Sequence, residues 1–267
     1  MKLAKFAFVC AAVASLTAVA DGEATSSTLG LMKVDNPNNL RTIPVGINFA
    51  AADGSAVSVS NAVKTAGLPE GTLLYAYNKS DSKYYIYSID GNAWTSNAKY
   101  SVDGNGQMTL DNTAPANAML LPAGSAAFLV LPSTATPEQV NVITAGKPVD
   151  TAASGVIGSG VNLCCFPVGK AVNLNQTNTS ASDYAAPLKA TPTVTQFVEN
   201  SGKTAISTIG DTIVVLRSDS GSSRVYYYDG TNWGYIGKAS GAKTFITSDA
   251  TIPGGVGFWY NSVQASN

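Results

Sequence analysis

Two short stretches of this sequence decide its fold: residues 223–233 read SRVYYYDGTNW, and residues 84–94 read YYIYSIDGNAW. Each is an aromatic run followed by Asp-Gly and then by a tryptophan. Asp-Gly between β-type runs is a strong signal for a two-residue hairpin turn, because both central residues need a positive φ. We therefore expect one β-hairpin centred on Asp90-Gly91 and another centred on Asp229-Gly230.

Counting outward from these turns predicts the register of both hairpins. Tyr87 is expected opposite Trp94. In the same way, Tyr226 is expected opposite Trp233. Directly opposed aromatic pairs contribute roughly 0.2–1 kcal/mol to a sheet. A slip of one residue would move each tryptophan to the other face, so the register is a strict prediction.

Strand alternation then places the tyrosines and the tryptophan of each hairpin on one face. The residues expected on these aromatic faces are Tyr85, Tyr87, Ile89 and Trp94 in the first hairpin, and Arg224, Tyr226, Tyr228, Trp233 and Tyr235 in the second. Two interpretations remain open. The rings pack against a second layer of the same domain, or they stay partly exposed and bind sugar rings or a protein partner.

The two hairpins belong to a longer internal repeat, because four landmarks recur in the same order. The pairs are 42–46 with 165–169, 71–75 with 211–215, 87–94 with 226–233, and 121–128 with 252–259. Their spacings differ, as insertions in surface loops would cause. The sequence thus predicts two homologous domains, at 27–132 and 145–264, joined by a Pro/Thr/Ser-rich linker at 133–144.

The remaining pattern is β-rich, and the predicted fold class is all-β, with two tandem β-sandwich or barrel-like domains. Residues 212–216 read TIVVL between glycine- and serine-rich segments, which is typical of a strand buried on both faces. Further strands are expected at 73–77, 126–131, 161–166 and 256–260. The best helical candidate, residues 57–66, is short, Ser-rich and β-branched.

The first twenty residues, MKLAKFAFVCAAVASLTAVA, are typical of a cleaved signal peptide. Lys2 and Lys5 precede an apolar run, and Ala18 to Ala20 offer the small residues of a cleavage site. A membrane anchor is the alternative, but spanning needs ~20 apolar residues and the run is shorter. No later segment approaches that length, so we expect an exported, secreted, periplasmic or cell-surface protein without a membrane-spanning segment in its mature chain.

Composition excludes several function classes. The 267 residues include no histidine, which rules out Ser-His-Asp catalysis and histidine-ligated metal sites. Lys and Arg number 16 against 17 Asp and Glu, so no basic surface for nucleic acid is expected. Charged residues make up only 12% of the chain, which weakens repulsion between copies and suits a protein that associates.

The mature chain has two cysteines, the neighbours Cys164 and Cys165. Alternation along a strand sends their side chains to opposite faces. Two free and largely buried thiols are the favoured state; a strained vicinal disulfide and an intermolecular bond are the alternatives. Two sulfurs are too few ligands for zinc.

Other candidate sites are weak, and no cofactor or metal is expected. Residues 103–107, DGNGQ, start like a calcium loop but lack its later glycine and glutamate. The glycines at 155–160 are not followed by the lysine of a phosphate-binding loop. Paired carboxylates, as in glycoside hydrolases, are the catalytic route that needs no histidine. The chain has only four glutamates, Glu23, Glu70, Glu138 and Glu199, while Asp211 borders a buried strand.

The motifs of the repeated plan are Ile/Phe-Pro-Val-Gly, Gly-Asp-Thr-Ile-Val-Val, Tyr-Tyr-Tyr-Asp-Gly-Thr-Asn-Trp and Ile-Pro-Gly-Gly-Val-Gly-Phe-Trp-Tyr. This plan resembles that of a group of exported, uncharacterised two-repeat proteins. They occur in bacteria of the Planctomycetes, Verrucomicrobia and Lentisphaerae kind. The resemblance is better over residues 205–260 than in the first copy, where Glu70-Gly71 replaces Gly210-Asp211. It implies export and a β fold, and it implies no activity.

The function expected from the sequence is that of a non-catalytic structural or interaction protein, secreted or on the cell surface. Its expected partners are envelope or extracellular proteins, or further copies of itself. A carbohydrate-binding module that uses the aromatic faces is the alternative. A carboxylate-dependent glycoside hydrolase is the third hypothesis.

Overall fold

The computed structural model describes residues 30–35, 40–78, 83–102, 108–111, 120–149, 160–166, 171–175, 192–216, 222–239 and 242–263. The predicted signal peptide, the loop at 103–107 and most of the loop at 155–160 lie outside these residues. The fold is all-β and sandwich-like, as predicted, and every strand pair is antiparallel. In the described part of the chain, no helix is long enough and apolar enough to cross a bilayer.

A six-stranded sheet forms the larger layer of the N-terminal half. Its strands lie in the order β2, β11, β6, β7, β8, β9. Their bounds are β2 Thr42–Gly46, β11 Ala126–Val130, β6 Leu73–Asn78, β7 Lys83–Asp90, β8 Ala93–Val102 and β9 Met108–Asp111. The predicted strands at 73–77 and 126–131 are therefore present.

A smaller layer packs beside this sheet. It contains β1 (Gly30–Asp35), β12 (Asn141–Pro148), β3 (Phe49–Ala50) and β5 (Val63–Lys64), with β12 pairing with the other three. The pair β4 (Val57–Ser58) and β10 (Leu120–Leu121) and the one-turn helix α2 (Val59–Ala62) complete it.

Strand β12 corrects the expected linker at 133–144. Within that range, η1 (Pro137–Gln139) is a 3-10 turn, and β12 begins at Asn141 and pairs with β1 over its first six residues. The Pro/Thr/Ser composition was misleading because it describes only the loop before η1. The chain leaves the N-terminal half after Pro148.

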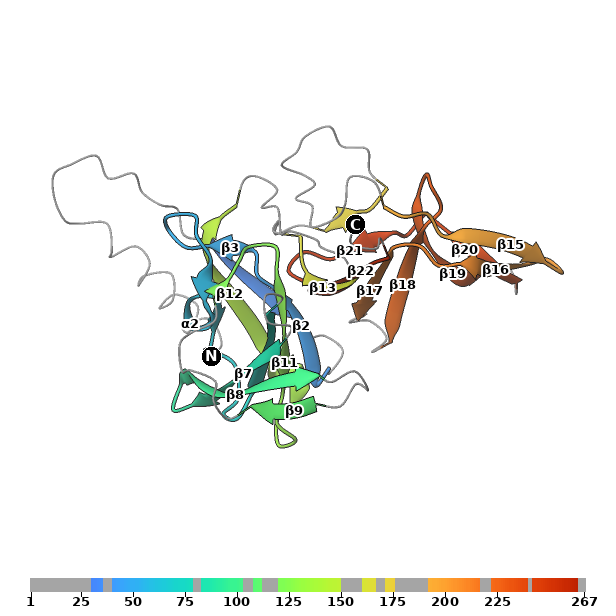
Figure 1. Ribbon diagram of the computed structural model, residues 1–267. Helices are drawn as coiled ribbons and strands as arrows, with labels where there is room; N and C mark the ends of the chain where they lie inside the picture. The colour runs from blue at the N-terminus through green and yellow to red at the C-terminus, as the bar shows by residue number, and fades with distance from the viewer. Residues whose placement is uncertain are drawn as a thin grey trace, which may run out of the picture.

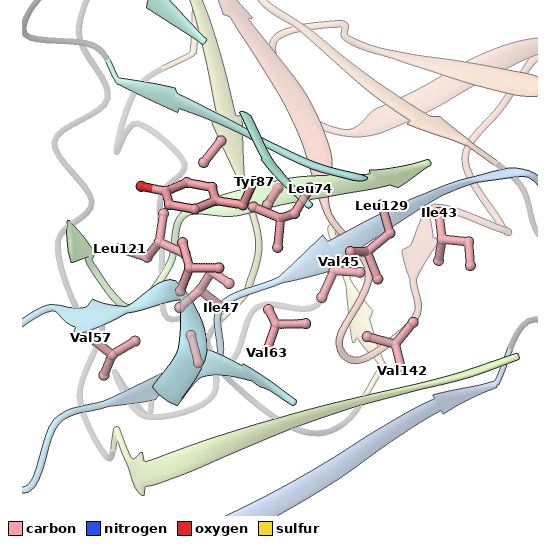
Figure 2. Close-up of a cluster of buried hydrophobic side chains, with 14 of the residues drawn as sticks. Ile43, Val45, Ile47, Val57, Val63, Leu74, Tyr87, Leu121, Leu129 and Val142 are labelled. Atoms are coloured by element: carbon pink, nitrogen blue, oxygen red, sulfur yellow. The ribbon is translucent and has the colours of Figure 1, made fainter. Parts of the chain in front are cut away.

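Aliphatic side chains fill the space between these two layers. Figure 2 shows Tyr87 among them, near Leu74 and Leu121, with Val45 and Leu129 farther along the same cluster. Tyr87 is 4% exposed, and the others are 1% exposed or less. Each buried aliphatic side chain of this size contributes about 1.5–3 kcal/mol relative to exposure, so this cluster holds the two layers together.

A second six-stranded sheet forms the C-terminal half, in the order β13, β22, β17, β18, β19, β20. Their bounds are β13 Gly160–Cys164, β22 Phe258–Ser262, β17 Thr212–Leu216, β18 Ser223–Tyr228, β19 Trp233–Ala239 and β20 Ala242–Ile246. The short pair β14 (Val172–Asn173) and β21 (Thr251–Ile252) packs on it through Val172 and Ile252. The hairpin of β15 (Gln196–Asn200) and β16 (Lys203–Thr208) lies beside β20, away from the first sheet (Figure 1).

The two large sheets have corresponding strand orders. The six strands of each sheet can be numbered one to six along the chain. In both sheets, the order in space is then one, six, two, three, four, five. The short pair β14–β21 likewise takes the place of β4–β10. The first landmark was misaligned, however. Pro44 lies inside β2, whereas β13 ends at Cys164, before Pro167. The register places Cys164, not Val168, at the position of Val45, because their partners Phe258 and Ala127 occupy matching places.

Both hairpins show the predicted face and a different register. Trp94 lies opposite Ile89, and Trp233 lies opposite Tyr228, so each tryptophan is two positions from its predicted partner. In the first hairpin the turn is Gly91-Asn92, with φ of 59° and 70°, because asparagine as well as glycine accepts a positive φ. A shift of two positions preserves the face of a strand. The aromatic faces are therefore right, and the direct opposition of Tyr87 to Trp94 and of Tyr226 to Trp233 is wrong.

Candidate functional site

The aromatic face of the second hairpin lies mainly in the core of the C-terminal half. Tyr226 is 2% exposed and Trp233 is 4% exposed. The ring of Trp233 contacts Tyr228 at a centroid distance of 5.5 Å and Tyr260 at 6.3 Å. Tyr226 meets Tyr235 edge to face at 6.0 Å. These rings fill a core that the aliphatic side chains of the sheet leave open.

The backbone of Trp233 is fixed by the side chain of Asn175, a residue that no sequence pattern singles out. The Trp233 N–H donates to Asn175 Oδ1 at 2.6 Å, and Asn175 Nδ2 donates to the Trp233 carbonyl at 2.7 Å. Asn175 thus replaces a neighbouring strand at this point. Such a contact between distant segments leaves no local signal in the sequence.

Arg224 lies at the edge of this cluster and links it to solvent. Its guanidinium lies 4.0 Å from the ring centroid of Tyr235, and Nη1 donates to Asp249 Oδ2 at 2.7 Å. Burial lowers the pKa of Arg224, but hydrogen bonds to Tyr226 and Asp249 outweigh that effect and raise it. Burial raises the pKa of the Tyr226 hydroxyl above its usual value. Both side chains therefore keep their ordinary charge at neutral pH.

The second hairpin forks immediately after its turn. Strands β18 and β19 pair at only two positions, Tyr227 with Gly234 and Tyr228 with Trp233. Beyond Gly234, β19 pairs with β20 instead, and Figure 1 shows β18 and β19 diverging. A Cβ on Gly234 would lie 2.6 Å from the carbonyl oxygen of Ile246. The close approach of β20 therefore requires glycine at the fork.

A polar cavity of about 510 Å³ lies in this fork. It is lined by Ser222, Ser223, Arg224, Tyr227, Tyr235 and Ile236. Tyr227 also packs edge to face on Phe197 of β15, at 6.3 Å. Of the predicted site residues, Arg224 and Tyr235 line this cavity, whereas Tyr226 and Trp233 belong to the core beneath it.

The first hairpin has no such fork, and its rings also serve the core. Tyr87 is buried, while Tyr85 and Trp94 are half-buried and pack against the aliphatic cluster. The Trp94 indole N–H donates to the carbonyl of Val63 at 2.8 Å. Tyr85 occupies the position in the first hairpin that Arg224 occupies in the second. Tyr85 lies four residues before Ile89, which pairs with Trp94. Arg224 lies four residues before Tyr228, which pairs with Trp233.

Cys164 and Cys165 are buried thiols that form no disulfide within the described part of the chain. Cys164 packs in the core of the C-terminal half, and Cys165 points toward Gly46 of the N-terminal half. Burial, and next the neighbouring Cys164, raise the pKa of the Cys165 thiol well above its usual value. The protonated form is a poor nucleophile, so the Cys165 thiol is unreactive at neutral pH.

Three of the described carboxylates considered for hydrolysis, Glu70, Glu199 and Asp211, have structural partners in separate elements. Glu70 accepts the N–H of Gly91 at 3.2 Å, and Glu199 accepts the hydroxyl of Thr204 at 2.7 Å. Asp211 is fully buried and accepts the Tyr260 hydroxyl at 2.7 Å and the N–H of Val263 at 2.9 Å. These contacts account for the residues without a catalytic role.

Comparisons of the chain with known protein families, with curated proteins and with solved structures find no match.

Proposed function

We propose that this protein is a non-catalytic structural or interaction component of the cell surface or extracellular space, which associates with itself or with envelope proteins. One observation carries the proposal. The rings that could have formed an extended binding face are used as core, since Tyr87, Tyr226 and Trp233 are all 4% exposed or less.

The proposal includes a duplicated β unit. It is supported by the corresponding strand orders of the two large sheets and by the matching short pairs β4–β10 and β14–β21. Export is supported by the signal-like sequence of residues 1–20. The small share of charged residues, 12%, weakens the repulsion that keeps soluble proteins apart.

Self-association and location test this proposal directly. The mature chain should form oligomers whose mass in multi-angle light scattering rises with protein concentration. In its native cells, the protein should fractionate with envelope material or the medium. A chain that stays monomeric at high concentration and remains in the cytosolic fraction would overturn the proposal.

Carbohydrate binding is a second candidate, and the forked cavity is the observation that favours it. Its serine hydroxyls, the guanidinium of Arg224 and the ring of Tyr235 offer hydrogen bonds and an apolar surface suited to a sugar. If it binds glycans, Tyr235→Ala should abolish retention on a glycan array. Lys238→Ala, an exposed change farther along β19, should leave retention intact. An array without hits for the unmodified protein would remove this candidate.

A further inference from the structure

The two halves meet through strand segments at the ends of their large sheets. An isolated antiparallel bridge joins Val45 to Val256, and another joins Ser125 to Cys164. The N–H of Gly46 donates to the carbonyl of Gly255 at 2.8 Å. The N–H of Cys165 donates to the carbonyl of Gly124, also at 2.8 Å. The junction therefore includes two short, similar backbone contacts, and Asn48 Nδ2 adds a buried hydrogen bond to the carbonyl of Phe166 at 2.7 Å.

These two contacts are copies of each other. Val45 and Cys164 hold matching places in their sheets, since they pair with Ala127 and Phe258. Ser125 and Val256 also match, because each lies two residues before that partner. One bridge thus joins Val45 to Val256, the counterpart of Ser125. The other bridge joins Ser125 to Cys164, the counterpart of Val45.

Residues near the centre of the junction contact their own counterparts. A Cβ on Gly46 would lie 2.6 Å from the Cβ of its counterpart Cys165. A Cβ on Gly257 would lie 2.7 Å from the Cβ of its counterpart, Ala126. Both distances are too short for two side chains, which explains why one member of each pair is glycine.

The aromatic contact across the junction follows the same rule. Phe128 and its counterpart Trp259 stack with ring centroids 4.7 Å apart and planes inclined by 27°. A surface whose residues contact their own counterparts is the signature of an isologous interface, the kind that joins the subunits of a twofold homodimer.

We infer that this junction is a self-complementary surface whose partner is a second copy of the chain. The N-terminal half of one chain docks on the C-terminal half of another through the same bridges that close the monomer. Exchange of identical contacts is a low-cost route to oligomers. The inference rests on the proposed self-association and names the surface through which it occurs.

A single substitution makes the exchange visible. The hydrogen bonds of the Val45–Val256 bridge are made by the flanking residues. The N–H of Gly46 donates to the carbonyl of Gly255, and the N–H of Gly257 donates to the carbonyl of Pro44. Val45 and Val256 therefore form a non-hydrogen-bonded pair. By the same relation, Ser125→Cys places a thiol directly opposite the native Cys164. Cα atoms in such pairs lie about 4.5 Å apart, which is within disulfide range.

The test is to oxidise the mature Ser125→Cys chain at increasing protein concentration and to map the disulfides by mass spectrometry. Mixed light and ¹⁵N-labelled chains distinguish bonds within a chain from bonds between chains. In dilute solution, the 125–164 bond should form within the chain. At high concentration, an increasing fraction should join a labelled to an unlabelled chain. Ser125→Ala, which keeps both native cysteines, should give neither product.

Light scattering of the unmodified protein separates the possible failures. If that protein associates while the 125–164 bond stays within chains at every concentration, this inference is wrong and the proposed function stands. If the unmodified protein never associates with itself, this inference is wrong, and the proposed function then stands only if the protein fractionates with envelope material or the medium. Val45→Cys/Val256→Cys repeats the experiment at the other bridge and covers the case in which Ser125→Cys does not fold.

A second experiment tests the self-complementarity of the surface within the monomer. Gly46→Cys should lower the urea midpoint, because its side chain collides with Cys165. The reciprocal double change Gly46→Cys/Cys165→Gly exchanges the two counterparts and should recover most of the loss. A double variant no more stable than Gly46→Cys alone would contradict the isologous arrangement.

Discussion

The two aromatic hairpins begin alike and end differently. In the first, β7 and β8 remain paired at eight positions, whereas in the second β18 and β19 pair at only two. The first hairpin stays paired across a register shift between Ile86 and Tyr87. The second instead releases β19 at Gly234 to pair with β20, which opens the polar cavity. A corresponding strand order thus permits either a continuous sheet or a forked one with a polar cavity in the fork.

The cores of the two halves also differ in the residues that fill them. In the N-terminal half, the pair Thr72 and Leu129 occupies the places that Asp211 and Tyr260 occupy in the C-terminal half. Aliphatic side chains make up nearly all of the first core, whereas the second core combines aliphatic side chains with five buried aromatic rings. The aromatic packing of Trp233, Tyr226 and Tyr260 compensates for the sheet pairing that the fork removes. The following variants test that conclusion.

The largest expected effect is at the tryptophans. Trp233→Ala should lower the free energy of unfolding by about 4 kcal/mol, the usual cost of truncating a buried tryptophan. Trp94→Ala should cost about 2 kcal/mol, because Trp94 is only half-buried. Urea unfolding followed by circular dichroism measures both values. Equal losses would show that the C-terminal half does not depend more strongly on its aromatic core.

The buried carboxylate gives the next largest effect. Asp211→Ala removes the acceptor of the Tyr260 hydroxyl and of the Val263 N–H, and it should cost about 3 kcal/mol. The matched change Thr72→Ala removes one hydrogen bond, to the carbonyl of Pro69, and should cost about 1 kcal/mol. Calorimetry compares the two. An Asp211 variant as stable as the Thr72 variant would contradict a structural role for this pair.

Local sequence patterns predicted the strands and their aromatic faces. They failed where contacts between distant segments determine the structure. The strand at 212–216 and the aromatic faces followed from alternation and turn residues. The register was wrong by two positions in both hairpins; in the first, Asn92 accepts a positive φ and moves the turn. The expected linker was wrong because β12 is a strand only through pairing with β1. Three features depend on tertiary contacts that no local pattern shows. They are the ion pair of Arg224 with Asp249, the hydrogen bonds of Asn175 to Trp233, and the fork between β18 and β19.

The turns offer a smaller and sharper comparison. Both central residues of the first turn, Gly91 and Asn92, have positive φ, whereas in the second turn Gly230 does and Thr231 does not. Asn92→Val should cost about 1–2 kcal/mol, since a β-branched residue is strained in the left-handed region. Thr231→Val should change stability by less than about 0.5 kcal/mol. A large loss for Thr231→Val would show that the turns are conformationally alike after all.

The smallest expected effect is a change in alkaline stability. Burial raises the pKa of Tyr226 above its usual value of 10.0, so the folded protein holds this proton more tightly than the unfolded chain does. The resulting stability is fully present below pH 10 and is lost as the pH rises through the raised pKa. Tyr226→Phe keeps the ring and removes the titrating group, so its urea midpoint should fall less steeply above pH 10 than that of the unmodified protein.

The neighbouring Tyr227 sharpens this measurement, because burial also raises its pKa while its side chain lies on the opposite face, against Phe197. Tyr227→Phe should therefore reduce the alkaline loss as well, and the two changes should add, since the faces of a strand are independent environments. If Tyr226→Phe leaves the slope above pH 10 unchanged while Tyr227→Phe reduces it, the aromatic face of the second hairpin is more open to water than the core that these rings form.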